Sequence, residues 1–136
     1  MKCIIAIACM AFTLAASAAD KGAVSNAQSS AKSWLALVDG GKFEASWDSA
    51  AAFFRSAITK ADWERTVTSV RAPLGVLKSR TLKSATPTRV LPSAPDGEYV
   101  VIQFESRFEN KASAIEIVTP MREKDGSWKV SGYYIK

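Results

Sequence analysis

The sequence contains no histidine, and its two cysteines, Cys3 and Cys9, both lie close to the N-terminus. Histidine and cysteine are the usual ligands of zinc and copper, so a transition-metal site is not expected. Their absence also removes the Ser-His and Cys-His pairs that activate most nucleophiles. We therefore predict no metal, no cofactor and no catalytic residue of these kinds, and any enzyme here would depend on carboxylate, lysine or tyrosine chemistry.

The chain has one long apolar run, and it is N-terminal. Met1 and Lys2 form a short basic start, residues 3–16 are almost wholly apolar, and Ala16-Ser17-Ala18 has the small-x-small pattern of a signal peptidase site. A retained membrane anchor is the alternative, but a spanning helix needs about 20 apolar residues. We expect a signal peptide over 1–18, cleavage between Ala18 and Ala19, and a periplasmic or secreted protein without cysteine or a transmembrane anchor.

The charge is modest, with a formal value of +5, but it is unevenly distributed. No acidic residue lies between Arg65 and Pro95, whereas acidic residues outnumber basic ones from Asp96 onward. One interpretation is an anion-binding patch. The other is that a basic strand lies beside acidic strands, where cross-strand pairs are stabilising. Because export keeps the protein away from the genome, nucleic acid is not an expected partner.

Three helices are predicted in the first half of the sequence. Residues 19–30, rich in small and polar side chains, are expected to form a flexible leader, and residues 31–136 a single α+β domain. The helical spacing of apolar residues appears three times: at Ala27, Ala31, Trp34 and Val38, ending at Asp39-Gly40-Gly41; at Phe43, Trp47, Ala51 and Phe54; and at Trp63, Val67 and Val70. Thr59 and Asp62 resemble a capping box before the third helix, and Pro73 and Gly75 close it.

The second half of the sequence predicts strands. The clearest alternation places Val100, Ile102, Phe104 and Phe108 on one face of a strand. Strands are also expected over residues 76–89, 112–122 and 128–135, separated by turns rich in Pro, Gly, Asp and Asn. The predicted fold is α+β, with three N-terminal helices packed on a curved four-stranded antiparallel sheet in a cone-like arrangement.

Several stretches together resemble a known family. They are WLALVDGG at 34–41, FEASW at 43–47, RAPLG at 71–75, PSAPDGEYV at 92–100 and WKVSGYY at 128–134. In this combination the chain, from about Ala31, resembles the family called domain of unknown function 4019. The resemblance implies a small exported bacterial protein with no assigned activity. The order of helices and strands is more loosely similar to the cone-shaped fold of nuclear transport factor 2, and fold likeness alone implies no function.

Charged side chains on the predicted strands and the third helix give a candidate site. Convergence on the concave face of the sheet would create a polar pocket, in which a bidentate arginine holds a carboxylate or phosphate. The alternative is a set of structural ion pairs that tie helix to sheet and bind no ligand. The candidate residues are Arg71, Arg80, Glu105 and Glu116, with Tyr99 or Tyr134 at the edge.

Three functions remain open at this point. The first is a non-enzymatic module of the bacterial envelope that binds an unknown small molecule or an envelope protein. The second is a cone-fold enzyme with Glu105 or Glu116 as a buried carboxylate base, its pKa raised by burial. The third is a structural protein that forms a homodimer through its sheet. The absence of histidine, thiol and nucleophile motifs counts against the second, and a binding module is the preferred interpretation.

Overall fold

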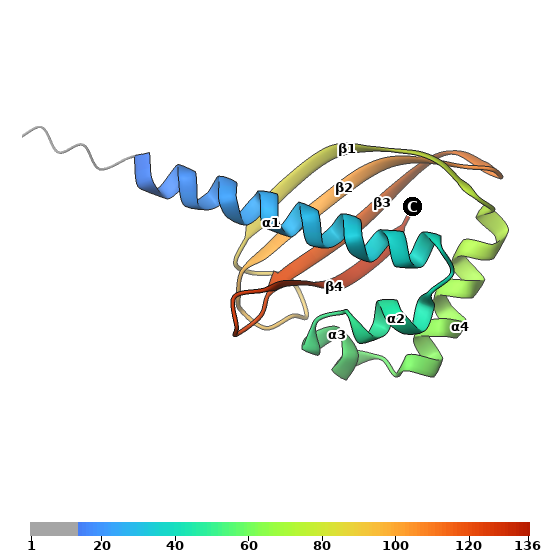
Figure 1. The fold of residues 1–136 in the computed structure, drawn as a ribbon, viewed down its shortest axis with the longest axis horizontal. Helices are drawn as coiled ribbons and strands as arrows, with labels where there is room; N and C mark the ends of the chain where they lie inside the picture. Colours follow the sequence, from blue (N-terminus) through green and yellow to red (C-terminus); the bar gives the residue numbers. More distant parts are fainter. Residues whose placement is uncertain (1–13) are drawn as a thin grey trace, which may run out of the picture.

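The computed structural model describes the backbone of residues 14–136 and the side chains from Lys21 onward, so residues 1–13 of the expected signal peptide lie outside it. Four antiparallel strands form one open sheet in the order β1-β2-β3-β4 (Figure 1). The described elements are α1 (Leu14–Asp39), α2 (Phe43–Asp48), α3 (Ala52–Ala57), α4 (Lys60–Arg71), the 3-10 turn η1 (Ala72–Leu74), β1 (Leu77–Thr88), β2 (Tyr99–Phe108), β3 (Lys111–Arg122) and β4 (Trp128–Ile135). The predicted α+β class and antiparallel sheet are confirmed.

The predicted flexible leader over 19–30 is wrong, because α1 runs through it without a break. Ala27 and Ala31 are fully buried, and Val24 packs against the core. The Ser30 hydroxyl donates a 2.6 Å hydrogen bond to the carbonyl of Trp128 on β4. Alanine has the highest helix propensity, and the buried face of the helix extends back through this segment. Residues 21–30 are therefore part of the packed domain.

The second predicted helix is also corrected, since the structure divides it into α2 and α3. The break at Ser49–Ala51 is held by the sheet, because the Ala51 amide donates a 2.8 Å hydrogen bond to Val130 on β4. Ala50 and Ala51 are fully buried at this point. The small side chains let the backbone approach β4 closely, which a continuous helix would not allow.

The third predicted helix is confirmed as α4. The Thr59 side chain accepts a 3.2 Å hydrogen bond from the Asp62 amide, which satisfies one of the free N–H groups of the first turn. The helix ends in η1, and Gly75 then takes a positive φ of 75° that turns the chain into β1. Within residues 14–136, no helix combines the length and the hydrophobicity that a membrane span requires.

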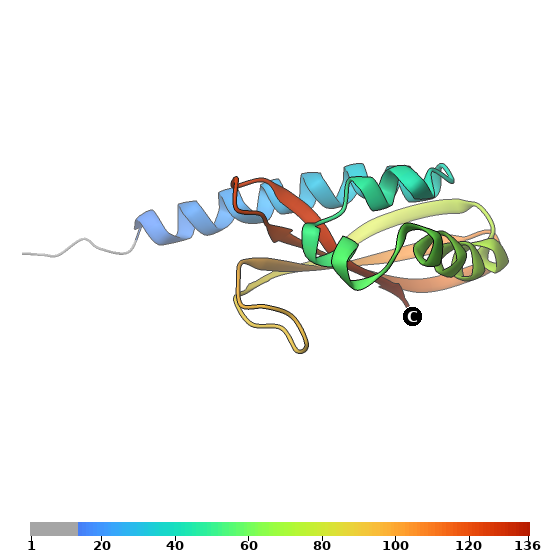
Figure 2. The ribbon, with the colours of Figure 1, turned by 90° about the horizontal axis from the view of Figure 1, so that it is seen from below.

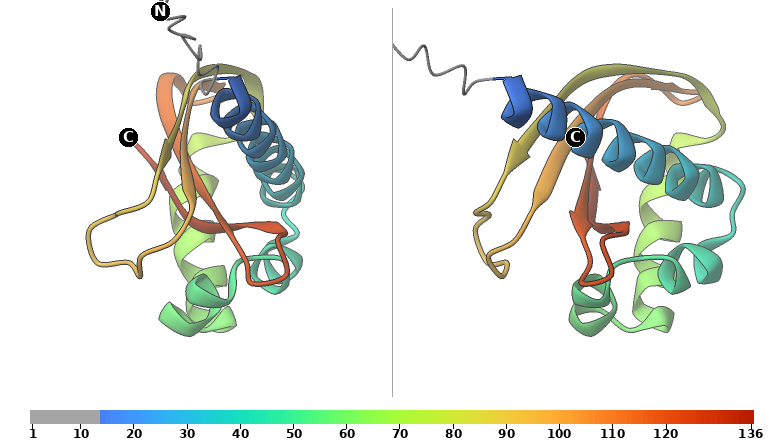
Figure 3. Two further views of the ribbon diagram at one scale, coloured as in Figure 1. Left: turned by 90° about the vertical axis from the view of Figure 1, so that its left-hand side faces the viewer. Right: turned by 60° about the vertical axis from the view of Figure 1, so that its left-hand side comes forward.

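One face of the sheet carries the core. Helix α1 contacts all four strands and crosses this face, and the loop between β1 and β2 extends on the other side (Figures 1 and 2). Helix α4 stands near one end of the sheet (Figure 3). Alternate residues of β2 point towards α1 and are buried, namely Val100, Ile102, Phe104, Ser106 and Phe108. Trp34 of α1 lies against Trp63 of α4, with ring centroids 5.8 Å apart, so the helices and the sheet share one core.

Candidate functional site

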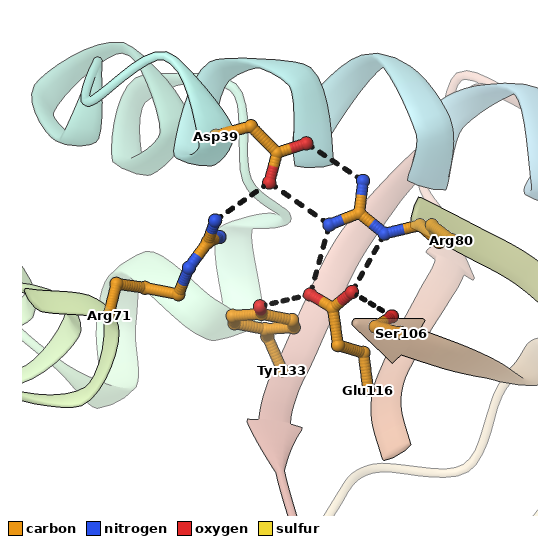
Figure 4. A network of polar contacts seen from close by, with 6 residues as sticks. All are labelled: Asp39, Arg71, Arg80, Ser106, Glu116 and Tyr133. Carbon is orange, nitrogen blue, oxygen red and sulfur yellow. Dashed lines mark hydrogen bonds and ion pairs between the residues drawn. The ribbon is translucent and has the colours of Figure 1, made fainter. Parts of the chain in front are cut away.

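A buried carboxylate, Glu116 of β3, lies at the centre of a polar network on the helix-covered face of the sheet (Figure 4). Its Cα pairs with that of Phe104, so both side chains point into the core. Arg80 of β1 binds it through two hydrogen bonds, Nε to Oε1 at 2.7 Å and Nη2 to Oε2 at 3.1 Å. The hydroxyls of Ser106 and Tyr133 donate to the same two oxygens. Four donors thus surround a fully buried carboxylate.

Asp39, the last residue of α1, connects the helix to this network. Its carboxylate accepts hydrogen bonds from Arg80, Nη1 to Oδ2 at 2.8 Å and Nη2 to Oδ1 at 3.0 Å. Arg80 is therefore bidentate to two carboxylates at once, through four hydrogen bonds from its planar guanidinium. Since Asp39, Arg80 and Glu116 lie on α1, β1 and β3, the ion pairs fix the end of α1 against the sheet.

Arg71, at the end of α4, makes fewer hydrogen bonds than Arg80. It donates one 3.0 Å hydrogen bond, from Nη2 to Oδ1 of Asp39. Its guanidinium carbon lies 5.0 Å from the ring centroid of Phe108. The side chain is only 8% exposed, yet its Nε and Nη1 atoms are buried and have no hydrogen-bond partner among the residues that the structure describes. Arg71 is thus a buried cation with unused donors.

The network changes the proton affinities of two members. Burial alone would lower the pKa of the Arg80 guanidinium, but the hydrogen bonds and charges of Asp39 and Glu116 outweigh it and raise that pKa. Burial raises the pKa of the Tyr133 hydroxyl, and the charge of Glu116 and the hydrogen bond to it raise it further. Arg80 therefore stays protonated and Tyr133 stays neutral over the physiological range.

A hollow of about 310 Å³ lies beside Arg71, between the ends of α1 and α4 and the start of β1. Its wall is mostly apolar, and Asp39, Thr68 and Arg71 supply the polar side chains. The apolar lining includes Val38, Phe43, Val76 and Leu77. A mainly apolar wall with a few polar groups is typical of small-molecule sites.

A second hollow, of about 190 Å³, lies between α4 and the end of β4. Trp63, Val67 and Tyr133 form part of its wall, and the hydroxyl of Tyr133 already donates to Glu116. This hollow is therefore mainly apolar on its inner side.

Three of the six predicted site residues meet in the network, and three do not. Glu105 neighbours Phe104 on β2 and so points to the opposite face of the sheet, where it is exposed. Tyr99 is buried at the far end of β2, with its hydroxyl donating to the Pro95 carbonyl. Tyr134 is 55% exposed and lines the hollow between α4 and β4. The expected convergence thus holds for Arg71, Arg80 and Glu116.

The network also contains three residues that the sequence analysis did not select: Asp39, Ser106 and Tyr133. Ser106 could have been found, because it falls on the apolar face of β2 between Phe104 and Phe108. Asp39 carried a signal only as part of a helix-ending Asp-Gly-Gly. The sequence gives no signal for Tyr133. A register shift between β3 and β4 at Thr119 and Pro120 decides which face of the sheet each residue of β4 occupies, and local alternation does not reveal it.

The fold and the site together define a small α+β domain with a helix-covered antiparallel sheet and a buried ion-pair network. The chain belongs to the family described as protein of unknown function (DUF4019), whose model matches residues 30–133. This confirms the family resemblance carried by the sequence motifs. No curated protein sequence matches the chain.

Proposed function

We propose that the protein is an exported, non-enzymatic binding module of the bacterial envelope, and that the hollow beside Arg71 is its ligand site. The observation that carries the proposal is the contrast between the two arginines. Arg80 uses its donors on Asp39 and Glu116, whereas Arg71, equally part of the network, keeps two buried nitrogens without a partner beside a hollow. An unpaired buried donor lowers the stability of a fold. A ligand that accepts hydrogen bonds from these nitrogens would remove that cost.

The geometry of the carboxylates argues against an enzyme. A general base needs a free lone pair directed at substrate, but both oxygens of Glu116 accept hydrogen bonds from Arg80 and from a hydroxyl. Glu105, the other carboxylate considered as a base, is exposed on the opposite face of the sheet. Neither residue combines burial with an open approach, which supports binding rather than catalysis.

The proposal includes export and a cone-like shape. The basic start, apolar run and Ala16-Ser17-Ala18 pattern support cleavage after Ala18. A cone formed by α1, α3, α4 and the sheet would have the Arg71 hollow near its edge, where α1 and α4 end.

Native mass spectrometry of the protein purified from the bacterial envelope tests this function. The expected result is a mature chain that starts at Ala19 and carries a small molecule or an envelope protein in fixed stoichiometry. A matched preparation of Arg71→Met should lose a ligand bound in the hollow, while Arg65→Met, on the exposed side of the same helix, should keep it. Recovery of the uncleaved chain from cytosol, or of a bare mature chain in every preparation, would contradict the proposal.

A further inference from the structure

The ligand class can be argued from the same hollow, so this inference rests on the proposed function. We infer that the hollow beside Arg71 binds a small monocarboxylate with an apolar body, the carboxylate lying against the Arg71 guanidinium. Figure 4 shows Arg71 reaching from α4 towards Asp39, with one nitrogen used and the others free. An oxyanion is the acceptor that a guanidinium binds best.

The environment of Arg71 selects an acceptor ligand. The Arg71 side chain is 8% exposed, and its Nε and Nη1 atoms are covered and have no hydrogen-bond partner among the described residues. Phe108 covers part of the group without supplying a hydrogen-bond acceptor, its ring centroid lying 5.0 Å from the guanidinium carbon. Arg71 lines the hollow. Its two unpaired nitrogens are covered in the structure, so the inferred complex includes a turn of the side chain that brings these N–H groups to the carboxylate.

The charge of the surroundings limits the ligand to one negative charge. Asp39 and Glu116 balance Arg71 and Arg80 within the network. Asp39 also lines the hollow, so a second negative charge on a bound ligand would lie near its carboxylate. A carboxylate brings one charge and leaves a small imbalance, whereas a phosphate dianion brings two into a partly buried site, where unpaired charge is unfavourable. A monocarboxylate is therefore preferred over phosphate.

The lining and the volume of the hollow indicate the size and polarity of the part of the ligand beyond its carboxylate. Val38, Phe43, Val76 and Leu77 make most of the lining apolar. The volume of about 310 Å³ lies at the lower end of small-molecule sites. It suits a single ring or a short alkyl chain, so phenylacetate and hexanoate are appropriate probes, with acetate and inorganic phosphate as comparisons.

Isothermal titration calorimetry of the mature chain, residues 19–136, tests the inference. Phenylacetate and hexanoate, used as probes that resemble the natural ligand and bind less tightly than it does, should bind saturably with 1:1 stoichiometry and a dissociation constant of about micromolar to low millimolar. Acetate should bind about 10-fold or more weakly because it lacks an apolar body, and phosphate should not bind saturably. Arg71→Met should weaken phenylacetate about 10-fold or more, since it removes the charged donors and keeps an apolar stem.

Two further variants separate loss of the site from loss of the fold. Val76 is 63% exposed at the rim, so Val76→Trp can fill the hollow without touching the ion pairs, and it should abolish phenylacetate binding. Arg65→Met removes the same charge from an exposed position of α4 and should leave binding unchanged. Equal binding by wild type and Val76→Trp, or phosphate binding as tight as phenylacetate, would overturn the inference.

The outcomes also separate this inference from the proposed function. A retained envelope protein or a neutral ligand in native mass spectrometry, together with no carboxylate binding by calorimetry, would overturn the ligand class and leave a binding module standing. Bare protein in the first experiment and no saturable binding in the second would overturn both.

Discussion

Glu116 is a fully buried carboxylate, and the hydrogen-bond donors around it stabilise its charge. Arg80, Ser106 and Tyr133 supply four donors to its two oxygens. A buried ion pair adds little to stability over an apolar pair of the same shape, but breaking it by removing one partner is costly. The network is therefore a point at which a single substitution should have a large effect.

Glu116→Gln tests this directly. The amide keeps the shape but turns an acceptor into an NH₂ donor facing the donors of Arg80, so unfolding free energy should fall by about 3–5 kcal/mol. Urea unfolding followed by tryptophan fluorescence measures the change. Glu105→Gln, the same substitution on the exposed face of the neighbouring strand, should stay within about 0.5 kcal/mol of wild type. Equal effects of the two substitutions would show that the network is not buried as described.

A second carboxylate, Glu64 of α4, should make stability depend on pH. Its Oε1 atom is covered and has no hydrogen-bond partner. Burial raises the pKa of Glu64, and the neighbouring carboxylate of Glu44 raises it further, against the smaller lowering effect of Lys60. A raised pKa means that the folded state favours the protonated acid. The stabilising contribution is present below the ordinary value of 4.5 and is lost as the pH rises through the folded-state pKa.

Glu64→Gln should therefore raise Tm at pH 7 and make little difference near pH 4, where wild-type Glu64 is protonated. Thermal unfolding across this pH range measures the effect. Glu44→Gln removes the other member of the pair and should change Tm in the same direction. A lower Tm at pH 7 for both variants would contradict this account of the pair.

Among the elements, the connection from η1 to β1 places Arg80 in the network, and Gly75 makes that connection. Gly75 has a φ of 75°, and a Cβ there would lie 2.9 Å from the Cβ of Glu109. Gly75→Ala should thus cost more than about 1 kcal/mol, because strain and steric overlap add. Gly132→Ala on β4 is the matched control, since a Cβ there meets nothing within 4 Å. Chemical denaturation of both variants compares them, and equal losses would refute the role given to Gly75.

The sequence predicted elements well where local chemistry determines them. Helix α4 has its own cap at Thr59, and β2 has a clear alternation of buried and exposed residues, so both were found near their observed bounds. The break between α2 and α3 was missed because a backbone hydrogen bond to Val130, far along the chain, causes it. The leader prediction over 19–30 failed for the same reason, since contacts with the sheet stabilise that part of α1.

Three of the six predicted site residues meet in the network, and the geometry of the sheet explains why the sequence did not predict the others. Arg80 and Glu116 lie on strands that are not adjacent, and their meeting depends on both side chains facing α1. Glu105 and Glu116 looked equivalent in the sequence, but pairing of Phe104 with Glu116 places the two carboxylates on opposite faces. Asp39 joins Arg80 across 41 positions of sequence, a contact that only the packing of α1 on the sheet creates.

For the molecule as a whole, the boundary of the folded domain can be tested by truncation. A chain of residues 31–136 should be less stable than one of residues 19–136 by about 1–3 kcal/mol. It loses the burial of Val24 and Ala27 and the hydrogen bond from Ser30 to Trp128. Equilibrium urea unfolding of the two chains measures the difference. Identical midpoints would restore the interpretation of residues 19–30 as a flexible leader.

Across the whole molecule, the network joins parts of the chain that are distant in sequence. Its member with the most unpaired hydrogen-bond donors, Arg71, lines a hollow. Asp39, Arg80 and Glu116 join α1 to the sheet, whereas Arg71 keeps two nitrogens without a hydrogen-bond partner among the described residues. In the function that we propose, structural and binding roles are divided between two arginines that share one carboxylate.

The most direct test observes these two arginines during ligand binding. In ¹⁵N-labelled residues 19–136, the Nε–H resonance of Arg71, assigned by its loss in Arg71→Met, should shift saturably as phenylacetate is added. The Arg80 Nε–H, held 2.7 Å from Glu116, should stay nearly unchanged. An unmoved Arg71 resonance at saturating phenylacetate, or a larger shift at Arg80, would contradict the division of roles on which this account depends.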